Sequence, residues 1–435
     1  MSEFPPEGYV PVTSSVPGIE IYMPAPEEPE GTPDVVEFRC PRCQATTAYS
    51  VADGGLRCAH CGYYEPPETP TVGKGAAEFE FTVETVTASR QAEGWGTERK
   101  TLRCESCGAE TSLPAGRLTH TCPFCGSNRV LQQEAAHDTL RPRFLIPFAV
   151  EPARCHEIAR EWLGSSWMTP RELKDAARIA DFQGIYLPHW TFDARTSATW
   201  RAEVGHTVTE RYYDAGSKSW KTRTKTVWRW ESGRAHLSFD DVLVAGTTRV
   251  SALLLQGIDD FDTRDLVPYA PSYLAGLLAQ AYDTPLDAAW ETAREQMREE
   301  TREACRAQAS TNRIRNFHVA LDFADESWRY VLAPVYVAVY RYGGEAYQML
   351  INGQTGTIAG QRPVDWTKVW LAVGAMLAPG LLLGLLAVLA TALGAVIPPS
   401  LAVGGGGLVL ALILLIIGGV FAVMTLTKAR KRDDA

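Results

Sequence analysis

Residues 40–62, CPRCQATTAYSVADGGLRCAHCG, and residues 104–126, CESCGAETSLPAGRLTHTCPFCG, share one cysteine spacing, C-x2-C-x14-C-x2-C. Thiolates at this spacing suit one tetrahedral zinc ion per array, because each C-x2-C pair can present two sulfurs to the same metal. We therefore predict two small β zinc ribbons, at residues 38–65 and 101–132, each holding one structural Zn2+. The predicted ligands are Cys40, Cys43, Cys58, Cys61, Cys104, Cys107, Cys122 and Cys125.

Disulfides and an iron–sulfur cluster are the alternatives to zinc at these cysteines. A disulfide framework rarely repeats its spacing so evenly, and only Cys155 and Cys305 lie outside the two arrays. Free thiolates imply a reducing compartment. Four cysteines also close the coordination shell and leave no position for a substrate or a catalytic water, so we expect structural metal sites.

The chain is acidic overall, and its N-terminal residues are especially rich in acidic residues and proline. The chain has 435 residues and a formal net charge of -9, so it has no overall attraction to nucleic acid or to anionic lipid. Residues 1–38 contain eight acidic residues and eight prolines, with no Lys or Arg before Arg39. We predict a disordered acidic tail over residues 1–37, because this composition cannot bury enough apolar surface to fold.

The central part of the chain has the pattern of an α+β domain, which we place at residues 140–363, after connecting strands in residues 66–100. Alternating runs around the turn Asp214-Ala215-Gly216 predict a β-hairpin. An amphipathic pattern predicts a helix at residues 153–164, and a capping box predicts one at 169–180. A helical pair is predicted at residues 270–283 and 285–310, the second with many opposite charges at helical spacing.

One strand of the predicted hairpin is strongly basic. In SWKTRTKTVWRW, residues 219–230, the cations Lys221, Arg223, Lys225 and Arg229 alternate with threonines and tryptophans and so share one face of a strand. This face could contact nucleic acid or anionic lipid headgroups. It could equally be a solvated sheet face above a core, which an acidic chain favours, and the sequence leaves the three interpretations of residues 221–229 open.

Two apolar runs close the sequence. Residues 369–397 and 401–427 contain no charged side chain, and each exceeds the roughly 20 residues that a helix needs to cross a bilayer. We predict a two-helix transmembrane hairpin with a basic tail at residues 428–435; a buried soluble helical hairpin is the alternative. Cations flank only the outer ends, which predicts an inner-membrane protein whose N-terminal domains and C-terminal tail are cytoplasmic. The cations are Lys368, Lys428, Arg430, Lys431 and Arg432.

A search for catalytic motifs favours a protein that is not an enzyme. Gly73-Lys74 is followed by Gly75 where a phosphate-binding loop needs Ser or Thr. His156-Glu157 begins like a zinc-protease helix, but Arg160 stands where the second histidine is required. We therefore assign no catalytic residue and no organic cofactor.

The ribbons, the segments YLPHWTFDA (186–194), LVPYAPSYLAGLLAQAYD (266–283) and INGQTGTIAGQRP (351–363), and the terminal hairpin together resemble a family of bacterial membrane-anchored double zinc-ribbon proteins. Its members are TFIIB-type zinc-ribbon-containing proteins, often mislabelled primosomal protein N'-like helicases. The resemblance implies metal binding by the eight cysteines and supplies no catalytic residue. Some relatives look to be encoded with phage-shock-type PspA and flotillin-like SPFH proteins, which implies protein partners of that kind.

These observations favour a non-enzymatic membrane scaffold or adaptor that recruits cytosolic proteins to the inner membrane, in envelope stress if the resemblance extends that far. The second hypothesis is a membrane-tethered nucleic-acid-binding zinc-ribbon protein, for which the ribbons and the basic strand would contact phosphates. An enzyme of unrecognised type is the third hypothesis, and a cleft with converging titratable groups would identify it.

Overall fold

The structure is a computed structural model of the full chain. It describes residues 9–12, 21–24, 38–67, 71–82, 85, 101–106, 110–112, 122–125, 127, 130–133, 140–173, 178–216, 218–393 and 399–433. Cys107, one of the eight predicted metal ligands, lies outside these residues.

The helices are α2 (Pro152–Gly164), α4 (Ala252–Gln256), α5 (Leu286–Ala307), α6 (Trp366–Leu393) and α7 (Pro399–Asp433). The strands of the N-terminal third are β1 (Tyr9–Val12), β2 (Ile21–Pro24), β3 (Ala48–Ser50), β4 (Gly55–Arg57), β5 (Tyr64–Glu65), β6 (Phe79–Glu80), β7 (Thr101–Cys104), β8 (Glu110–Ser112) and β9 (Val130–Gln133). The remaining strands are β10 (Phe144–Leu145), β11 (Arg178–Ile179), β12 (Gln183–Asp214), β13 (Ser219–Ala245), β14 (Val267–Pro268), β15 (Leu278–Ala279), β16 (Ile314–Tyr342), β17 (Glu345–Asn352) and β18 (Ile358–Gly360).

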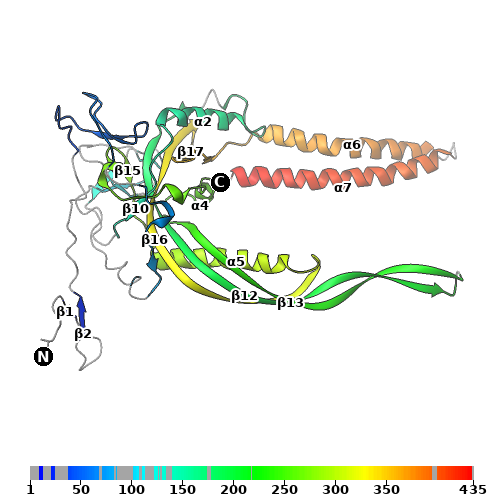
Figure 1. The fold of residues 1–435 in the computed structure, drawn as a ribbon. Helices are drawn as coiled ribbons and strands as arrows, with labels where there is room; N and C mark the ends of the chain where they lie inside the picture. The colour runs from blue at the N-terminus through cyan, green and yellow to red at the C-terminus, as the bar shows by residue number, and fades with distance from the viewer. Residues whose placement is uncertain are drawn as a thin grey trace, which may run out of the picture.

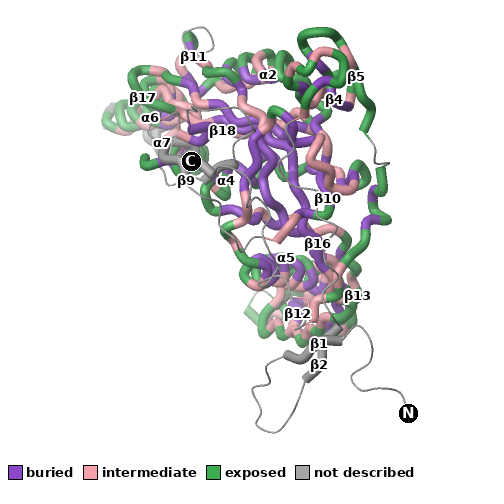
Figure 2. The backbone as a smooth tube through the Cα atoms, turned by 90° about the vertical axis from the view of Figure 1, so that its left-hand side faces the viewer, coloured by how far each residue is buried: buried purple, intermediate pink, exposed green. Residues whose placement is uncertain are grey.

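The body of the molecule is built on a sheet whose long strands are β12, β13, β16 and β17, paired antiparallel. Residues 185–192 of β12 and 328–338 of β16 are buried on both faces, as the purple segments of Figure 2 show, whereas β13 is mostly exposed. Aromatic side chains fill this core, and Trp190 packs against Trp328 and Tyr330. Large rings bury much apolar area per residue, so this cluster holds the centre of the sheet together.

Helix α5 covers one part of the sheet, beside β12 and β13 (Figure 1). Ala289, Ala293 and Met297 recur every four residues along it and are fully buried. Its outer surface carries ion pairs at a spacing of three residues, including Arg298 with Glu295. Helix α5 thus has one apolar face and one charged face, and it confirms the helix predicted for residues 285–310 from opposite charges at helical spacing.

A two-stranded arm extends from the body. The pairing of β12 with β16 ends at Val204 and Ile314, whereas β12 continues to pair with β13 as far as Asp214 and Ser219. Residues 205–214 and 219–228 therefore form a ribbon of two strands, which we call the arm. Figure 1 shows the arm projecting from the body in the same direction as α6 and α7.

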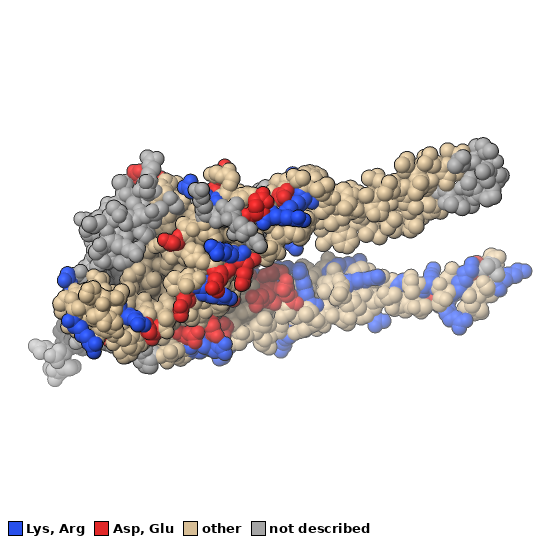
Figure 3. Space-filling view, turned by 90° about the horizontal axis from the view of Figure 1, so that it is seen from above, with Lys and Arg blue, Asp and Glu red and all other residues tan. Residues whose placement is uncertain are grey.

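Helices α6 and α7 form an antiparallel pair that also projects from the body (Figure 1). Residues 366–392 and 406–430 are long and apolar enough to cross a membrane, and most of their side chains are exposed in the structure. Figure 3 shows the pair as an uncharged surface over most of its length, whereas Lys and Arg follow the arm. A helix pair that exposes apolar side chains along its length needs an apolar solvent, which supports membrane insertion.

Small residues bring α6 and α7 close together. A Cβ atom added to Gly418 would lie 2.5 Å from the backbone oxygen of Met376, and one added to Gly407 would lie 2.9 Å from the Cβ of Ala387. Helices in lipid associate through such close contacts, because no hydrophobic effect drives them together there.

The helical pair joins the body at a small apolar contact, which we call the joint. Met168 packs against Val369 at the start of α6 and Ala429 at the end of α7, and all three are buried. The amide of Asp365 donates a 2.7 Å hydrogen bond to the carbonyl of Met168. Both ends of the pair therefore lie at the body, on the same side of the apolar surface.

Three segments differ from the sequence expectations. Within the tail predicted to be disordered, β1 and β2 pair antiparallel, since each contributes a short run of apolar and aromatic residues. Arg178 and Ile179, expected at the end of a helix, pair with β16 instead. The predicted helix at residues 270–283 is wrong, because Leu278 and Ala279 form a strand parallel to Ile185 and Tyr186. In the last two segments, pairing with a neighbouring strand prevails over local helical preference.

Candidate metal centres

The first cysteine array forms a compact cluster of four thiols. The sulfurs of Cys40 and Cys61 are 3.4 Å apart, and those of Cys43 and Cys58 are 3.5 Å apart. The four sulfurs all lie within 4.8 Å of one another. Sulfurs on a tetrahedral zinc with Zn–S bonds of about 2.3 Å would be separated by about 3.8 Å, so the cluster is close to the size that a metal ion requires.

Two tight backbone turns hold these sulfurs in place. The amide of Gln44 donates to the carbonyl of Cys40, and the amide of Gly62 donates to the carbonyl of Cys58. Gln44 and Gly62 both adopt left-handed backbone conformations, with φ of 60° and 73°. The glycine after Cys61 was evident in the sequence, but nothing there indicated that Gln44 takes the matching conformation, which glutamine adopts only rarely.

Backbone hydrogen bonds lower the pKa of Cys40 and Cys58, whereas burial and the neighbouring thiols raise the pKa of Cys43, to about 12, and of Cys61. The backbone amides of Cys61 and His60 lower the pKa of Cys58 to about 6, against the opposing effect of its partial desolvation. Donors aimed at a sulfur stabilise its negative charge. Cys58 is therefore prepared to bind a cation at neutral pH.

The second array has the same arrangement where the structure describes it. The sulfurs of Cys104 and Cys125 are 3.5 Å apart, matching the first and fourth cysteines of the first array, and Cys122 lies within 4.8 Å of both. The amide of Cys122 donates to the carbonyl of Ser127, as that of Cys58 does to Tyr63. Two cysteine clusters, of four and three described residues, could thus each hold a metal ion.

The two clusters are attached to the body in different ways. The first belongs to a separate three-stranded sheet of β3, β4 and β5, and the second lies on β7, whose partner β8 continues into the large sheet through β15. Figure 1 shows residues 38–65, in dark blue, on the side of the body away from α6 and α7. The first cluster and the apolar helices therefore lie at opposite ends of the described molecule.

A buried charge network lies at the centre of the body, and nothing in the sequence indicated it. Arg329 contacts three carboxylates through one nitrogen, Nη2, at 2.9 Å from Glu78, 3.4 Å from Asp193 and 2.6 Å from Asp241. One carboxylate oxygen from each of Asp193, Asp240 and Asp241 lies within 4.8 Å of the others. The guanidinium offsets part of this negative charge and Lys74 pairs with Asp240, so we interpret the group as a structural ion network.

The segments that carried the family resemblance contribute to the same kind of structural support. Asp193 belongs to residues 186–194, and its carboxylate accepts a hydrogen bond from the backbone amide of Asp241. Asn352, fully buried in residues 351–363, donates to the carbonyl of Ile258 and to the carboxylate of Asp260. These polar groups attach loops to the sheet.

The basic face of the arm is as predicted from its alternation. Lys221, Arg223 and Lys225 lie opposite Tyr212, Glu210 and Val208, on one face of the ribbon. Lys221 forms an ion pair with Asp214, and both Arg223 and Lys225 form ion pairs with Glu210. Cross-strand carboxylates therefore offset much of the positive charge on this face.

Comparison with known proteins finds two informative similarities. The chain is 25% identical to the uncharacterized protein YdjG of Bacillus subtilis over 338 residues, which cover 77% of this chain and 92% of that protein. It is 34% identical to transcription factor S of Methanocaldococcus jannaschii over 113 residues, which cover 25% of this chain and 87% of that protein. No family of known proteins matches the chain, and no solved structure matches it.

The two similarities cover different shares of the chain. That to YdjG covers 77% of this chain and 92% of that protein, so most of the chain has a counterpart there. That to transcription factor S covers a quarter of the chain, so this quarter is related to that protein while three quarters lie outside the match. The shorter match supports a zinc-ribbon assignment for part of this chain.

Proposed function

We propose that this protein is a non-enzymatic scaffold of the bacterial inner membrane, in which two zinc ribbons recruit cytosolic protein partners. The observation that carries the proposal is the placement of the first cysteine cluster at the far end of the body from α6 and α7 (Figure 1). A protein anchored through this helical pair presents the cluster to the solvent, well away from the bilayer.

Zinc is the metal that suits these clusters best. A site of four cysteine thiolates with closed tetrahedral coordination is typical of structural zinc, and each ribbon is too small to fold on its own apolar core. We propose one Zn2+ for each cluster, with Cys107 as the fourth ligand of the second.

The orientation follows from charge at the joint. Lys368, Lys428 and Arg430 lie at the ends of the helices next to the body, and the positive-inside rule assigns such ends to the cytoplasm. Thiolate-bound zinc requires the same reducing compartment. PspA-like or SPFH proteins are the partners that the resemblance implies, and envelope stress is the setting in which such partners act.

The test is recovery of partners from native membranes. The full-length protein is crosslinked mildly, purified with and without nuclease, and compared with the Cys40→Ser/Cys43→Ser variant. We expect partners that resist nuclease and that the variant loses, while the variant remains in the membrane fraction. The control, Cys305→Ala, removes a thiol from α5 that takes no part in either cluster and should keep the partners. Equal recovery by the variant and the wild type would contradict the proposal.

The arm supports a second candidate, a membrane-tethered nucleic-acid binder. Trp220 is 64% exposed near the tip, next to the cations of the basic face. Exposed aromatic rings beside cations can stack on bases and contact phosphates. The affinity for single-stranded nucleic acid should then fall steeply with salt, and should weaken in the variant Lys221→Gln/Arg223→Gln/Lys225→Gln. A flat salt dependence would exclude this candidate in favour of the scaffold.

A further inference from the structure

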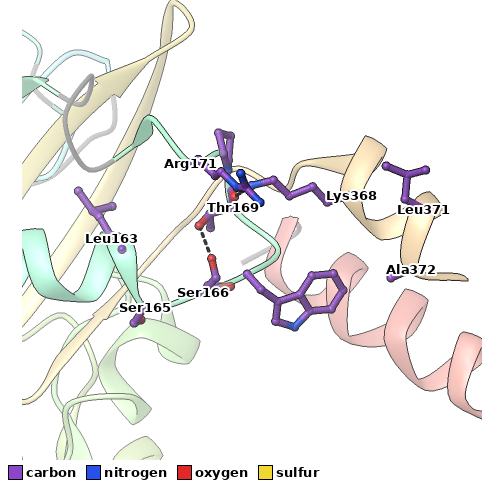
Figure 4. A pocket seen from close by; sticks show the side chains of 11 residues that line it. Leu163, Ser165, Ser166, Thr169, Arg171, Lys368, Leu371 and Ala372 are labelled. Atoms are coloured by element: carbon purple, nitrogen blue, oxygen red, sulfur yellow. Dashed lines mark hydrogen bonds between the residues drawn. The ribbon is translucent and has the colours of Figure 1, made fainter. Parts of the chain in front are cut away.

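A cavity of about 810 Å3 lies at the joint, between the loop after α2 and the first turns of α6. Its lining changes character along α6. Arg171 and Lys368 lie near Thr169 at one end, whereas Leu371 and Ala372 lie further along the helix, toward its apolar part (Figure 4). Trp167, which is 52% exposed, belongs to the same lining.

The polar end of the cavity is cationic. The ammonium group of Lys368 donates a 2.5 Å hydrogen bond to the carbonyl of Thr169, and its charge is shared with Asp365 at 3.6 Å. Arg171 is exposed and forms no ion pair with another described residue. Lys428 and Arg430 are exposed on either side of Ala429, which packs into the joint. Among the residues that line the cavity, Arg171 and Lys368 are cations and none is acidic.

The position of the cavity along α6 matches the boundary of a bilayer. The apolar part of α6 begins next to Lys368, and that of α7 ends at Thr427, so the headgroups lie at about the level of Lys368 and Lys428. Leu371 is one turn deeper than Lys368, at the depth where acyl chains begin. Tryptophan is enriched at this level in membrane proteins, because its ring is apolar and its N–H is polar.

We propose that this cavity binds one anionic phospholipid, with its phosphate against Arg171 and Lys368 and the first part of its acyl chains along Trp167, Leu371 and Ala372. The cationic end of the cavity matches the phosphate of a phospholipid, and its apolar end matches the acyl chains. The site would attach the body firmly to the leaflet from which α6 enters. This inference rests on the membrane placement of α6 and α7, and it does not depend on which partner the cysteine clusters bind.

The test counts lipids on the purified full-length protein in detergent by native mass spectrometry. Phosphatidylglycerol and phosphatidylcholine with identical acyl chains are added separately after delipidation. We expect one phosphatidylglycerol to bind preferentially, and the preference to fall about fivefold for each cation removed in Arg171→Gln and Lys368→Gln, since one cation near an anionic surface contributes about that factor. Lys368→Arg keeps the charge and should keep the preference.

Two controls separate this site from general effects. Arg298→Gln/Arg302→Gln removes two cations from α5, on the opposite side of the body from α2, and should leave lipid binding unchanged (Figure 1). Soluble glycerol phosphate, which has the phosphate but no acyl chains, should bind far more weakly than the lipid. The inference is overturned if phosphatidylcholine binds equally well, if the α5 variant loses the preference as much as the cavity variants, or if glycerol phosphate competes fully. Loss of partners with lipid binding intact would affect the scaffold proposal alone.

Discussion

Nη2 of Arg329 donates a 2.6 Å hydrogen bond to Oδ1 of Asp241, and the two side chains are only 1% and 6% exposed. Asp241 lies near the C-terminal end of β13, away from the tip of the arm, and Glu78 lies in the N-terminal third of the chain. The guanidinium therefore joins three separate parts of the chain. The network therefore ties the connection between the ribbons and the body to the centre of the sheet.

Replacing Arg329 with Met should destabilise the body strongly. The substitution leaves Glu78, Asp193 and Asp241 close together without a cation, and breaking a buried ion network in this way costs about 3–5 kcal/mol. Thermal unfolding of the purified full chain measures the effect. Arg154→Met, which removes an exposed ion pair with Glu157, is the control and should change stability by less than about 1 kcal/mol. Equal effects of the two variants would show that the network contributes little.

The same network predicts a dependence of stability on pH. Burial, together with the neighbouring Glu78, raises the pKa of Asp193 from 3.8 to about 6, although Arg329 and the amide of Asp241 act in the opposite direction. The folded protein therefore binds a proton more tightly than the unfolded chain does. The stabilisation from this proton is complete below pH 3.8 and is lost as the pH rises to about 6.

Asp193→Asn removes this titration and provides the measurement. The difference in unfolding temperature between the wild type and the variant should change across about pH 4 to 6 and stay constant above about pH 7. Release of metal at acidic pH affects both proteins alike and cancels in the difference. A difference that is constant over the whole range would contradict the raised pKa.

Metal analysis should find two zinc ions per chain in the wild type. Cys40→Ser/Cys43→Ser should contain one, because two of the four sulfurs that define the first cluster are lost. Cys305→Ala should still contain two. A strong chelator should remove the metal and unfold the ribbons, since metal binding provides their folding free energy. An unchanged metal content in the double variant would show that the first cluster is not a metal site.

The packing of α6 on α7 can be tested at two adjacent glycines. A Cβ on Gly418 would lie 2.5 Å from the backbone oxygen of Met376, whereas one on Gly419 would meet nothing within 4 Å. Gly418→Ala should therefore destabilise the helical pair by about 1–3 kcal/mol, as overpacking does, and Gly419→Ala should not. Unfolding of the purified protein by titration with a denaturing detergent measures both. Similar curves for the two variants would show that the helices do not pack at this point.

Local patterns in the sequence predicted the parts of the protein that depend on local chemistry. The cysteine spacing identified the first cluster, and opposite charges at helical spacing identified α5. The apolar runs identified α6 and α7, although the structure starts the first helix at Trp366 and carries the second to Asp433, and residues 394–398 lie outside the described part. In each case a few neighbouring residues contain the whole signal.

Features that depend on distant residues could not be predicted in this way. Leu278 and Ala279 form a strand because Ile185 and Tyr186 lie beside them, and a short apolar run does not distinguish strand from helix. Arg329 gathers carboxylates from positions as far away as Glu78. The cavity at the joint brings together Arg171 and Lys368, which are far apart in the sequence. Only the tertiary fold determines these contacts.

The parallel directions of the arm and the helical pair constrain how the protein can sit on a bilayer. Lys221, Arg223 and Glu210 would all have to enter hydrocarbon if the arm followed α6 and α7 into the membrane, and each such burial is costly. Insertion of the helices therefore requires the arm to turn outward relative to them, and the joint, with only three buried side chains, is where that rotation is least opposed. An arm turned onto the headgroups would give the body a second point of support, which limits its tilt relative to the bilayer and so the height at which the cysteine clusters are held.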